Sequence, residues 1–371
     1  MISLSRPSIG EAEIEAVADV LRSGWLSTGD VVRKFEEAVA ALCRCKYAVA
    51  CMSGTDALYL ALRAQDIGPY DEVIVPSMTF CATVNAVVRT GAMPVFADID
   101  AGTLCLSASS VARALCQGMQ VKAVMPVHFG GAPCDVAGAL TEFGRDAFLL
   151  ADGAHALGAR AFGGPVARLA DATVFSFHPT KNITTGEGGM IVTDDPELAA
   201  KVRRLRFHGL DEIRQVVEVG VKSNMPDVLA AIGLAQLPRL QKMNGRRRLR
   251  ADRYARLLAH VDGVVVPRGP SFNHVHARHL MSVLVDFGLY GLTRKDVVAR
   301  MASRGVEVGV HYVAVHQHPY YVALYERLHM GVQLPVTEMV SERILSLPLY
   351  PDMHDFDVDV VVDAFIEVLR G

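Results

Sequence analysis

One lysine in this sequence lies where its amine could do chemistry. Lys181 falls in a polar, glycine-containing loop between two short apolar runs, 174–177 and 190–193, which are typical of buried strands. A loop lysine is ordinarily a solvated surface charge, but loops at strand ends are also where α/β sheets bind ligands. A partly desolvated lysine loses its proton more readily and becomes a nucleophile. Pyridoxal phosphate is the cofactor that such an amine binds, as a Schiff base.

A carboxylate and an imidazole follow another predicted strand. Residues 147–151 are apolar, and Asp152 and His155 come directly after them. An aspartate at this position is often only a turn former, and a lone histidine is as often structural as functional. Beside a pyridoxal ring, a carboxylate keeps the pyridine nitrogen protonated, and the ring then accepts electrons. Asp152 is therefore a candidate partner of that ring.

The turn Ser53-Gly54-Thr55 is a candidate anion site. It joins a predicted strand, 47–52, to a predicted helix, 55–65. A helix N-terminus presents free backbone N–H groups to an anion, although serine and threonine are also ordinary N-cap residues. The glycines that follow Lys181 lack the spacing of a phosphate-binding P-loop and are weak evidence alone.

The segment SFHPTKNITTGEGGM (176–190) resembles the lysine loop of the DegT/StrS family of sugar aminotransferases, which are fold-type I pyridoxal phosphate enzymes. The resemblance continues from SGWLSTG (23–29) to LPLYPDM (347–353). It implies that Lys181, Asp152 and His155 are the catalytic residues. The residues that it assigns to pyridoxal 5'-phosphate are Gly54, Thr55, Phe80, Asp152, His155, Ser176, Lys181 and Asn224.

The resemblance also gives these residues roles. Gly54, Thr55 and Ser176 would bind the phosphate group, and His155 would lie near the ring hydroxyl. Phe80, which the sequence alone would place in the core, would stack on the pyridine ring. Asn224 begins the family-like segment NMPDVLAAIGLAQL, where helix capping alone explains an asparagine. In the family this asparagine reaches the phosphate of the neighbouring subunit, which implies a homodimer with shared active sites.

Two further segments resemble substrate-facing parts of the family. SGWLSTGD supplies Trp25 and Thr28, although a lone tryptophan is ordinarily a core residue, and its Asp30 replaces the family's usual proline. HYVAVHQH (311–318) has Ala314 where the family has proline. It supplies the candidates His311, Tyr312 and His316. Because this segment lacks helical ligand spacing and partner acids, we expect no metal there.

The resemblance implies a two-stage transamination. L-glutamate would donate the amino group, with Lys181 moving the proton as base and acid. The acceptor would be a nucleotide-linked keto sugar, aminated at the 4-keto group of a 6-deoxyhexose for surface polysaccharide or natural product. The alternatives are a keto-inositol, a 3-keto sugar, a dehydratase, in which histidine replaces the lysine, and a cofactor-binding regulator without turnover.

Composition restricts the class of protein. The 371 residues are 51% hydrophobic and 21% charged, as in a globular protein with a substantial core, and a net charge of −3 gives no reason to expect nucleic acid. We interpret the basic run 246–250 as a solvated helix face. No apolar stretch has membrane-spanning length, and the seven scattered cysteines suggest reduced thiols, so we expect a cytoplasmic protein.

The periodicity predicts an α/β fold. Together with the resemblance, it indicates a mainly parallel central sheet flanked by helices in a large domain, 1–245, and a smaller C-terminal α/β domain, 246–371. The other expected elements are helices at 10–22, 293–303 and 357–369, a long helix led by Asn224, and strands at 73–75, 121–127, 280–286 and 306–310.

Overall fold

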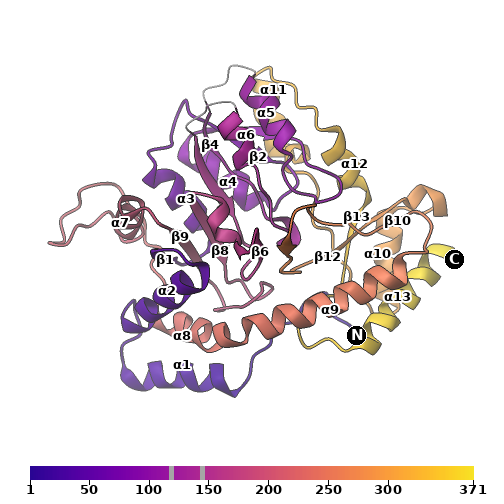
Figure 1. The fold of residues 1–371 in the computed structure, drawn as a ribbon, viewed down its shortest axis with the longest axis horizontal. Coiled ribbons are helices and arrows are strands. Elements are labelled where there is room, and N and C mark those ends of the chain that lie inside the picture. The colour runs from indigo at the N-terminus through magenta and orange to yellow at the C-terminus, as the bar shows by residue number, and fades with distance from the viewer. Residues whose placement is uncertain (117–120, 143–146) are drawn as a thin grey trace.

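The computed structural model describes residues 1–116, 121–142 and 147–371, and its centre is a seven-stranded sheet (Figure 1). The strand order is β1-β9-β8-β5-β4-β2-β3. Only β9 runs antiparallel to its neighbours. The predicted mainly parallel α/β fold is therefore confirmed. The strands are β1 (Tyr47–Cys51), β2 (Glu72–Pro76), β3 (Met93–Ala97), β4 (Val121–Val124), β5 (Phe148–Asp152), β8 (Ala172–Ser176) and β9 (Gly189–Thr193).

Helices cover both faces of this sheet. Successive side chains of a strand point to opposite faces, and β1 shows the consequence: Val49 packs with α3, α4 and α7, whereas Ala48 packs with α2, α8 and α9. Phe35 of α2 and Phe177, with ring centres 5.1 Å apart, fill the second of these cores. The helices of this part are α1 (Glu11–Ser23), α2 (Asp30–Cys43), α3 (Gly54–Ala64), α4 (Cys81–Thr90), α5 (Ala108–Cys116), α6 (Ala137–Glu142), α7 (Pro196–Leu205) and α8 (Asp227–Gln236).

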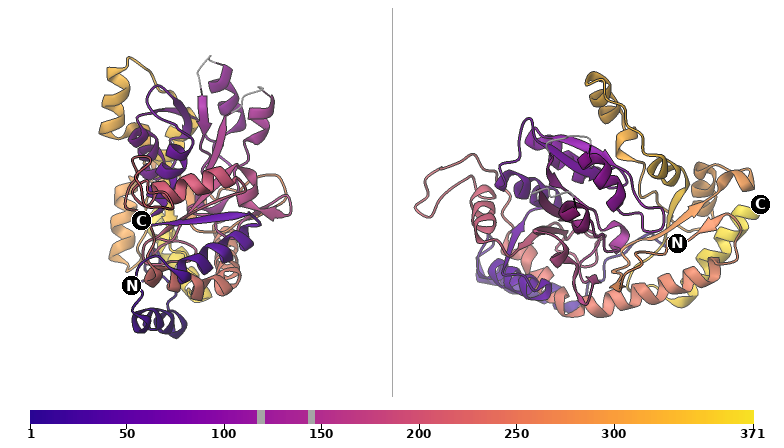
Figure 2. Two further views of the ribbon diagram at one scale, coloured as in Figure 1. Left: turned by 90° about the vertical axis from the view of Figure 1, so that its left-hand side faces the viewer. Right: turned by 45° about the horizontal axis from the view of Figure 1, so that its top comes forward.

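The C-terminal part is built on a small antiparallel sheet of order β10-β12-β13 (Figures 1 and 2). Helix α9 (Leu240–Leu258) runs from α8 to this sheet, so the predicted boundary at 245/246 falls inside a continuous helix and remains a prediction. The other elements that follow α9 in the chain are β10 (Val264–Val265), β12 (Met281–Val285), β13 (Ile344–Leu347), α10 (Arg294–Ser303), α11 (Pro319–Arg327), α12 (Pro335–Arg343) and α13 (Asp355–Arg370). Of these, α11 and α12 pack against the cores of the large sheet. A separate three-stranded sheet comprises β6 (Arg160–Ala161), β7 (Gly164–Pro165) and β11 (His274–Val275).

One sequence-based expectation for local structure is wrong. The predicted strand 306–310 forms only isolated bridges, from Val306 to Ile2 and from Gly309 to Ser346. Val306 and Val308 are buried and Val310 is partly buried, but they have no continuous partner strand, so the alternation reflects burial rather than sheet pairing. Trp25 is 62% exposed, which argues against the core position that a lone tryptophan ordinarily has.

The apolar side chains of α1 are only partly covered. Val20 is buried against the body, but Ile14 and Leu21 are each more than half exposed. A second group of exposed apolar side chains lies on the long loop that follows α7 and projects from the body (Figures 1 and 2). Its members are Ile213, Val216, Val217 and Val219. These surfaces are candidates for contact with another chain.

The close approach of β9 to the start of α3 depends on a glycine. A Cβ added at Gly189 would lie 2.2 Å from the carbonyl oxygen of Ser53, which is backbone and cannot rotate away. We expect Gly189→Ala to reduce the free energy of unfolding by about 2 kcal/mol, because overpacking displaces main chain.

Denaturant unfolding measures this effect, with Gly138→Ala as the matched control. Among the described atoms, a Cβ at Gly138 would meet nothing within 4 Å, and alanine favours the helix α6 more than glycine does, so the control should be at least as stable as the parent protein. Equal stability of Gly189→Ala and the parent protein would show that the approach of β9 to Ser53 is not restrictive.

Candidate active site

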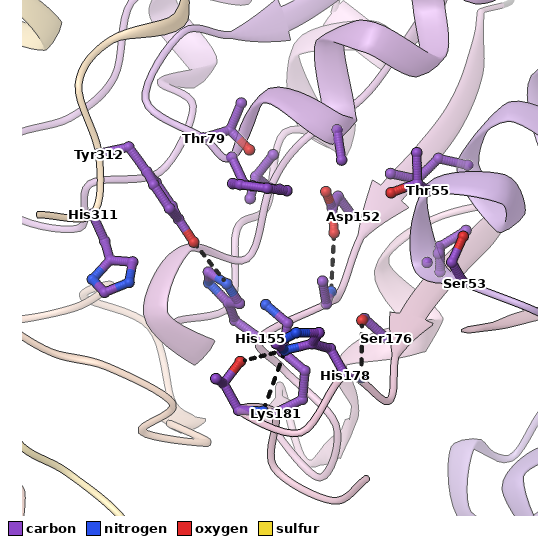
Figure 3. A pocket seen from close by; sticks show the side chains of 18 of the residues that line it. Ser53, Thr55, Thr79, Asp152, His155, Ser176, His178, Lys181, His311 and Tyr312 are labelled. Carbon is purple, nitrogen blue, oxygen red and sulfur yellow. Dashed lines mark hydrogen bonds between the residues drawn. The ribbon is translucent and has the colours of Figure 1, made fainter. Parts of the chain in front are cut away.

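A cavity of about 350 Å³ opens at the carboxyl ends of the central strands (Figure 3). The start of α3, the end of β5, the loop between β8 and β9, and the segment 311–312 all contribute to its wall. The predicted residues that line it are Gly54, Thr55, Phe80, Asp152, His155, Ser176, Lys181, His311 and Tyr312. Segments far apart in the sequence therefore place their polar side chains around one space.

One end of the cavity is a cradle at the N-terminus of α3. Ser53 caps the helix, because its hydroxyl accepts a hydrogen bond from the backbone N–H of Asp56 at 3.0 Å. Gly54 allows the end of β8 to come close, since a Cβ there would lie 2.9 Å from the Cβ of Ser176. The hydroxyls of Thr55 and Ser176 line the same end of the cavity. Helix N–H groups together with hydroxyls suit an anion.

The carboxylate of Asp152 is buried and held in one orientation. The hydroxyl of Thr83 donates to it at 2.7 Å, and the backbone N–H of Ala154 donates at 3.0 Å. Burial raises the pKa of Asp152, while these two hydrogen bonds and the charge of Lys181 oppose the shift. Thr83 was not singled out in the sequence, where it is one more polar residue at the start of a helix.

Lys181 is the only lysine among the described residues that line this cavity. Its backbone N–H donates to the carbonyl of His178 at 2.9 Å. Burial lowers the pKa of Lys181 to about 8, and the charge of Asp152 opposes that shift. The neutral, nucleophilic amine is therefore available close to neutral pH.

Hydrogen bonds determine the tautomer of His155. The backbone N–H of Gly130 donates to Nδ1 at 3.2 Å, so the neutral ring carries its proton on Nε2, 3.3 Å from the hydroxyl of Tyr312. Burial lowers the pKa of His155 well below its usual value, and the charge of Lys181 adds to the effect. His279, which sequence reasoning missed, lies against His155 with ring centres 4.3 Å apart.

Phe80 and His311 also face the cavity. The ring of Phe80 is 55% exposed, at the start of α4, with its centre 5.9 Å from that of Tyr312. It is therefore a wall residue rather than a core residue. His311 Nδ1 lies 3.0 Å from the hydroxyl of Ser346. Burial lowers the pKa of His311 to about 4, with the charge of Lys181 as the second cause.

His316 does not line the cavity. Its Nδ1 lies 2.7 Å from the hydroxyl of Ser77, which also accepts a hydrogen bond from the backbone N–H of His316 at 2.9 Å. Its Nε2 lies 3.5 Å from the carboxylate of Glu338. These contacts attach the segment that carries Tyr312 to the loop that follows β2.

Three other predicted residues form a separate group at the start of α8. The side-chain amide of Asn224 donates to the hydroxyl of Thr28 at 2.6 Å. The indole N–H of Trp25 donates to the backbone carbonyl of Thr28 at 3.4 Å. Lys222 contributes an ammonium group that donates to the side-chain oxygen of Asn224. None of the four belongs to the described wall of the cavity.

The interpretation of the basic run 246–250 as a solvated face is wrong for Arg247. This side chain is only 4% exposed, and it donates to the backbone carbonyls of Asn182 at 3.2 Å and Lys181 at 3.4 Å. The loop that carries Lys181 packs on this face of α9, so the helix has a buried polar stripe that charge counting could not reveal.

Comparison with known proteins identifies the family. The model of the DegT/DnrJ/EryC1/StrS aminotransferase family matches residues 7–366. The chain belongs to this family.

Solved structures of aminotransferases have the same fold over nearly the whole length of this chain. The aminotransferase TlmJ from Streptoalloteichus hindustanus is 35% identical, with a TM-score of 0.90 over 100% of this chain and 99% of TlmJ. DesI, solved in the presence of its TDP-sugar product, is 34% identical, with a TM-score of 0.87 over 100% of this chain and 93% of DesI. The sugar-aminotransferase candidate Spr1654 from Streptococcus pneumoniae, solved in its PLP form, is 30% identical, with a TM-score of 0.89 over 99% of this chain and 98% of Spr1654.

This DegT-family chain is an enzyme of the transaminase class, and its cofactor is pyridoxal phosphate. The cavity fits that group, because it combines an anion cradle, an amine and a buried carboxylate. The described residues include no cluster of three His, Cys, Asp or Glu side chains that could hold a metal ion. Helices in the described part of the chain are all too short or too polar to cross a membrane.

The charge of Asp152 should control the protonation of Lys181. Because that charge raises the pKa of the amine, we expect Asp152→Asn to move the pKa below its value of about 8. In the enzyme freed of cofactor, modification of Lys181 by an amine-reactive reagent should then begin at lower pH. Peptide mass spectrometry across a pH series measures the midpoint.

The matched control is Asp66→Asn, which removes a surface carboxylate that pairs with Lys201. It should leave the midpoint unchanged. A midpoint that stays in place, or rises, in Asp152→Asn would contradict the electrostatic link between the two groups.

Proposed function

We propose that this enzyme transfers the amino group of L-glutamate to the 4-keto group of a nucleotide-linked 6-deoxyhexose. The observation that supports this most is the meeting of the Lys181 amine, the buried Asp152 carboxylate and the α3 cradle in one cavity. DesI, solved in the presence of its TDP-sugar product, supports a nucleotide-linked acceptor. The product would be an amino sugar for surface polysaccharide or a natural product, made in the cytoplasm.

Separate residues would hold the phosphate and the pyridine nitrogen of the cofactor. The α3 N-terminus at Gly54 and Thr55, together with the Ser176 hydroxyl, would bind its phosphate. Asp152 would pair with the pyridine nitrogen, and the hydrogen bond from Thr83 keeps that carboxylate in place. When bound, the cofactor supplies an electron sink, which accepts the electrons released when a bond to the substrate's α-carbon breaks.

His155 and Phe80 would position the cofactor ring. The proton that Gly130 fixes on Nε2 makes His155 a hydrogen-bond donor toward the cavity, suited to a ring hydroxyl or its oxyanion. Phe80 would lie against the ring face, since its side chain is exposed to the cavity rather than packed in the core.

Lys181 would be both the covalent attachment point and the proton carrier. A pKa of about 8 lets the amine accept a proton from a substrate carbon and return it at neutral pH. The presence of this lysine distinguishes the chain from family dehydratases, which carry histidine there. His311 and Tyr312 would contact the substrate from the opposite wall.

We further propose a homodimer with shared active sites. Trp25 and Leu26 are exposed beside Thr28 and Asn224, and the loop after α7 carries more exposed apolar surface. Covering these side chains with a second copy would remove them from water. Asn224, Trp25 and Thr28 would then serve the partner's cavity, which accounts for their position outside their own. His316 would act indirectly, by holding the segment that carries Tyr312.

L-glutamate alone should complete half of the reaction. Addition to the pyridoxal phosphate-loaded enzyme should replace its absorption spectrum with that of pyridoxamine phosphate and release 2-oxoglutarate. The Lys181→Ala variant should lose turnover while it still binds cofactor, because the proton carrier is gone.

A panel of acceptors offered to the aminated enzyme then tests the sugar. Return of the original spectrum with a 4-keto nucleotide sugar is the expected result, whereas return only with a 3-keto sugar or a keto-inositol would replace the proposed acceptor. A spectrum that glutamate leaves unchanged would refute the proposed donor, and full turnover by Lys181→Ala would refute the proton carrier.

Mixed dimers test the sharing of sites. Lys181→Ala and Asn224→Ala subunits should each be impaired alone. After unfolding and refolding together, hybrid dimers gain one intact site if Asn224 acts in the partner's cavity. Activity should then reach about a quarter of the parent value, since about half of the dimers are hybrids. No recovery in hybrids confirmed by mass would place Asn224 in its own subunit's site.

A further inference from the structure

Arg247 is a buried cation that the proposed chemistry does not use. It lies in the middle of α9, is 4% exposed, and forms no ion pair with any described residue. Burial lowers the pKa of its guanidinium to about 10, and the charge of Asp352 only partly opposes the shift. A charged group in such a place is unfavourable unless its hydrogen bonds compensate for the lost water.

Those hydrogen bonds go to the main chain of the lysine loop. Nη1 donates to the carbonyl of Asn182 at 3.2 Å, and Nη2 donates to the carbonyl of Lys181 at 3.4 Å. The backbone N–H of Lys181 donates to His178. Both peptide groups of Lys181 are therefore held, and its side chain leaves from a fixed point toward the cavity. A guanidinium provides two donors in a rigid plane, which a lysine ammonium does not.

Asn244, one turn before Arg247, extends this attachment. Its side-chain oxygen accepts from Arg247 at 3.3 Å and from the side-chain amide of Asn182 at 2.7 Å. Its own amide donates to the carbonyl of Leu157 at 2.9 Å, two residues after His155. Asn244 and Arg247, on one face of α9, therefore hold the loops that carry Lys181 and His155 by hydrogen bonds.

One and two turns further along, the same helix is tied to the C-terminal part. Arg253 forms two hydrogen bonds with the carboxylate of Asp359 in α13, at 2.7 and 2.6 Å, and Arg250 donates to the carbonyl of Met353 at 2.9 Å. The position of Arg247 is therefore defined by both parts of the molecule. Lys181 takes its position from a helix more than sixty residues away in sequence.

We propose that Arg247 is a positioning residue for Lys181, which keeps the amine where it can form its bond to the cofactor. The inference rests on the proposed role of Lys181. Loss of the two carbonyl contacts would free the loop main chain and move the amine from its attack position. Misplacement of a reacting group by about 1 Å lowers reactivity by about a hundredfold.

Two ligands separate positioning from general stability. Pyridoxal phosphate can bond to Lys181, whereas pyridoxamine phosphate carries no aldehyde and binds without that bond. In Arg247→Gln, the dissociation constant of pyridoxal phosphate should rise by about tenfold or more, because the amine is misplaced. That of pyridoxamine phosphate should change less than twofold. Titration of the enzyme freed of cofactor measures both constants.

Arg246→Gln is the matched control on the same turn of α9. Arg246 is exposed and pairs with Asp352 on the surface, so its loss should alter neither constant. Arg247→Lys keeps the charge without the fork and should show the selective loss, even if Arg247→Gln fails to fold. Equal loss for both ligands, no loss in a folded Arg247→Gln, or an unchanged Arg247→Lys would each overturn the proposal.

A parent enzyme that binds the two ligands equally well, and no better than Lys181→Ala, would instead refute the role of Lys181. The failure of the proposed function is therefore distinguishable from the failure of the role of Arg247.

Discussion

The site depends on holding the Lys181 amine and the Asp152 carboxylate in one cavity, where each influences the protonation of the other. Burial disfavours both charges, and each charge favours the other, so the pKa values of Lys181 and Asp152 are set together. Neither group can reorganise freely: Thr83 and a backbone N–H hold Asp152, and the loop main chain holds Lys181. The rest of the fold serves to place these two side chains in the same cavity.

The sheet and α9 do most of this placing. Parallel strands end at one edge, so β5 delivers Asp152 and β8 delivers Ser176 beside the start of α3. Because β9 runs antiparallel to β8, the lysine loop that joins the two strands lies at this same edge. Gly189, at the start of β9, allows the close approach to Ser53 at the start of α3. Helix α9 packs against that loop near its start, and its later turns pack on the C-terminal sheet. The cavity is therefore a property of the whole chain rather than of any single motif.

The sequence predicted the parts of the site that short motifs encode. The lysine loop, the turn before α3 and Asp152 each follow a predicted strand. Because parallel strands end at one edge of a sheet, the sequence could predict that these residues lie close together. Arg247 and Thr83 could not be found in this way, because their importance comes from partners distant in the sequence. The predicted strand 306–310 is absent for a related reason, since strand pairing depends on neighbours that periodicity does not specify.

The most direct test of the account is the site of covalent attachment. The enzyme loaded with pyridoxal phosphate can be reduced with borohydride, which makes the lysine bond permanent, and then digested and analysed by peptide mass spectrometry. The account predicts the pyridoxyl group on Lys181. In the Lys181→Ala variant, which keeps Asp152 and His155, the corresponding peptide should carry no label. A label on another lysine, or none in a cofactor-saturated enzyme, would contradict it.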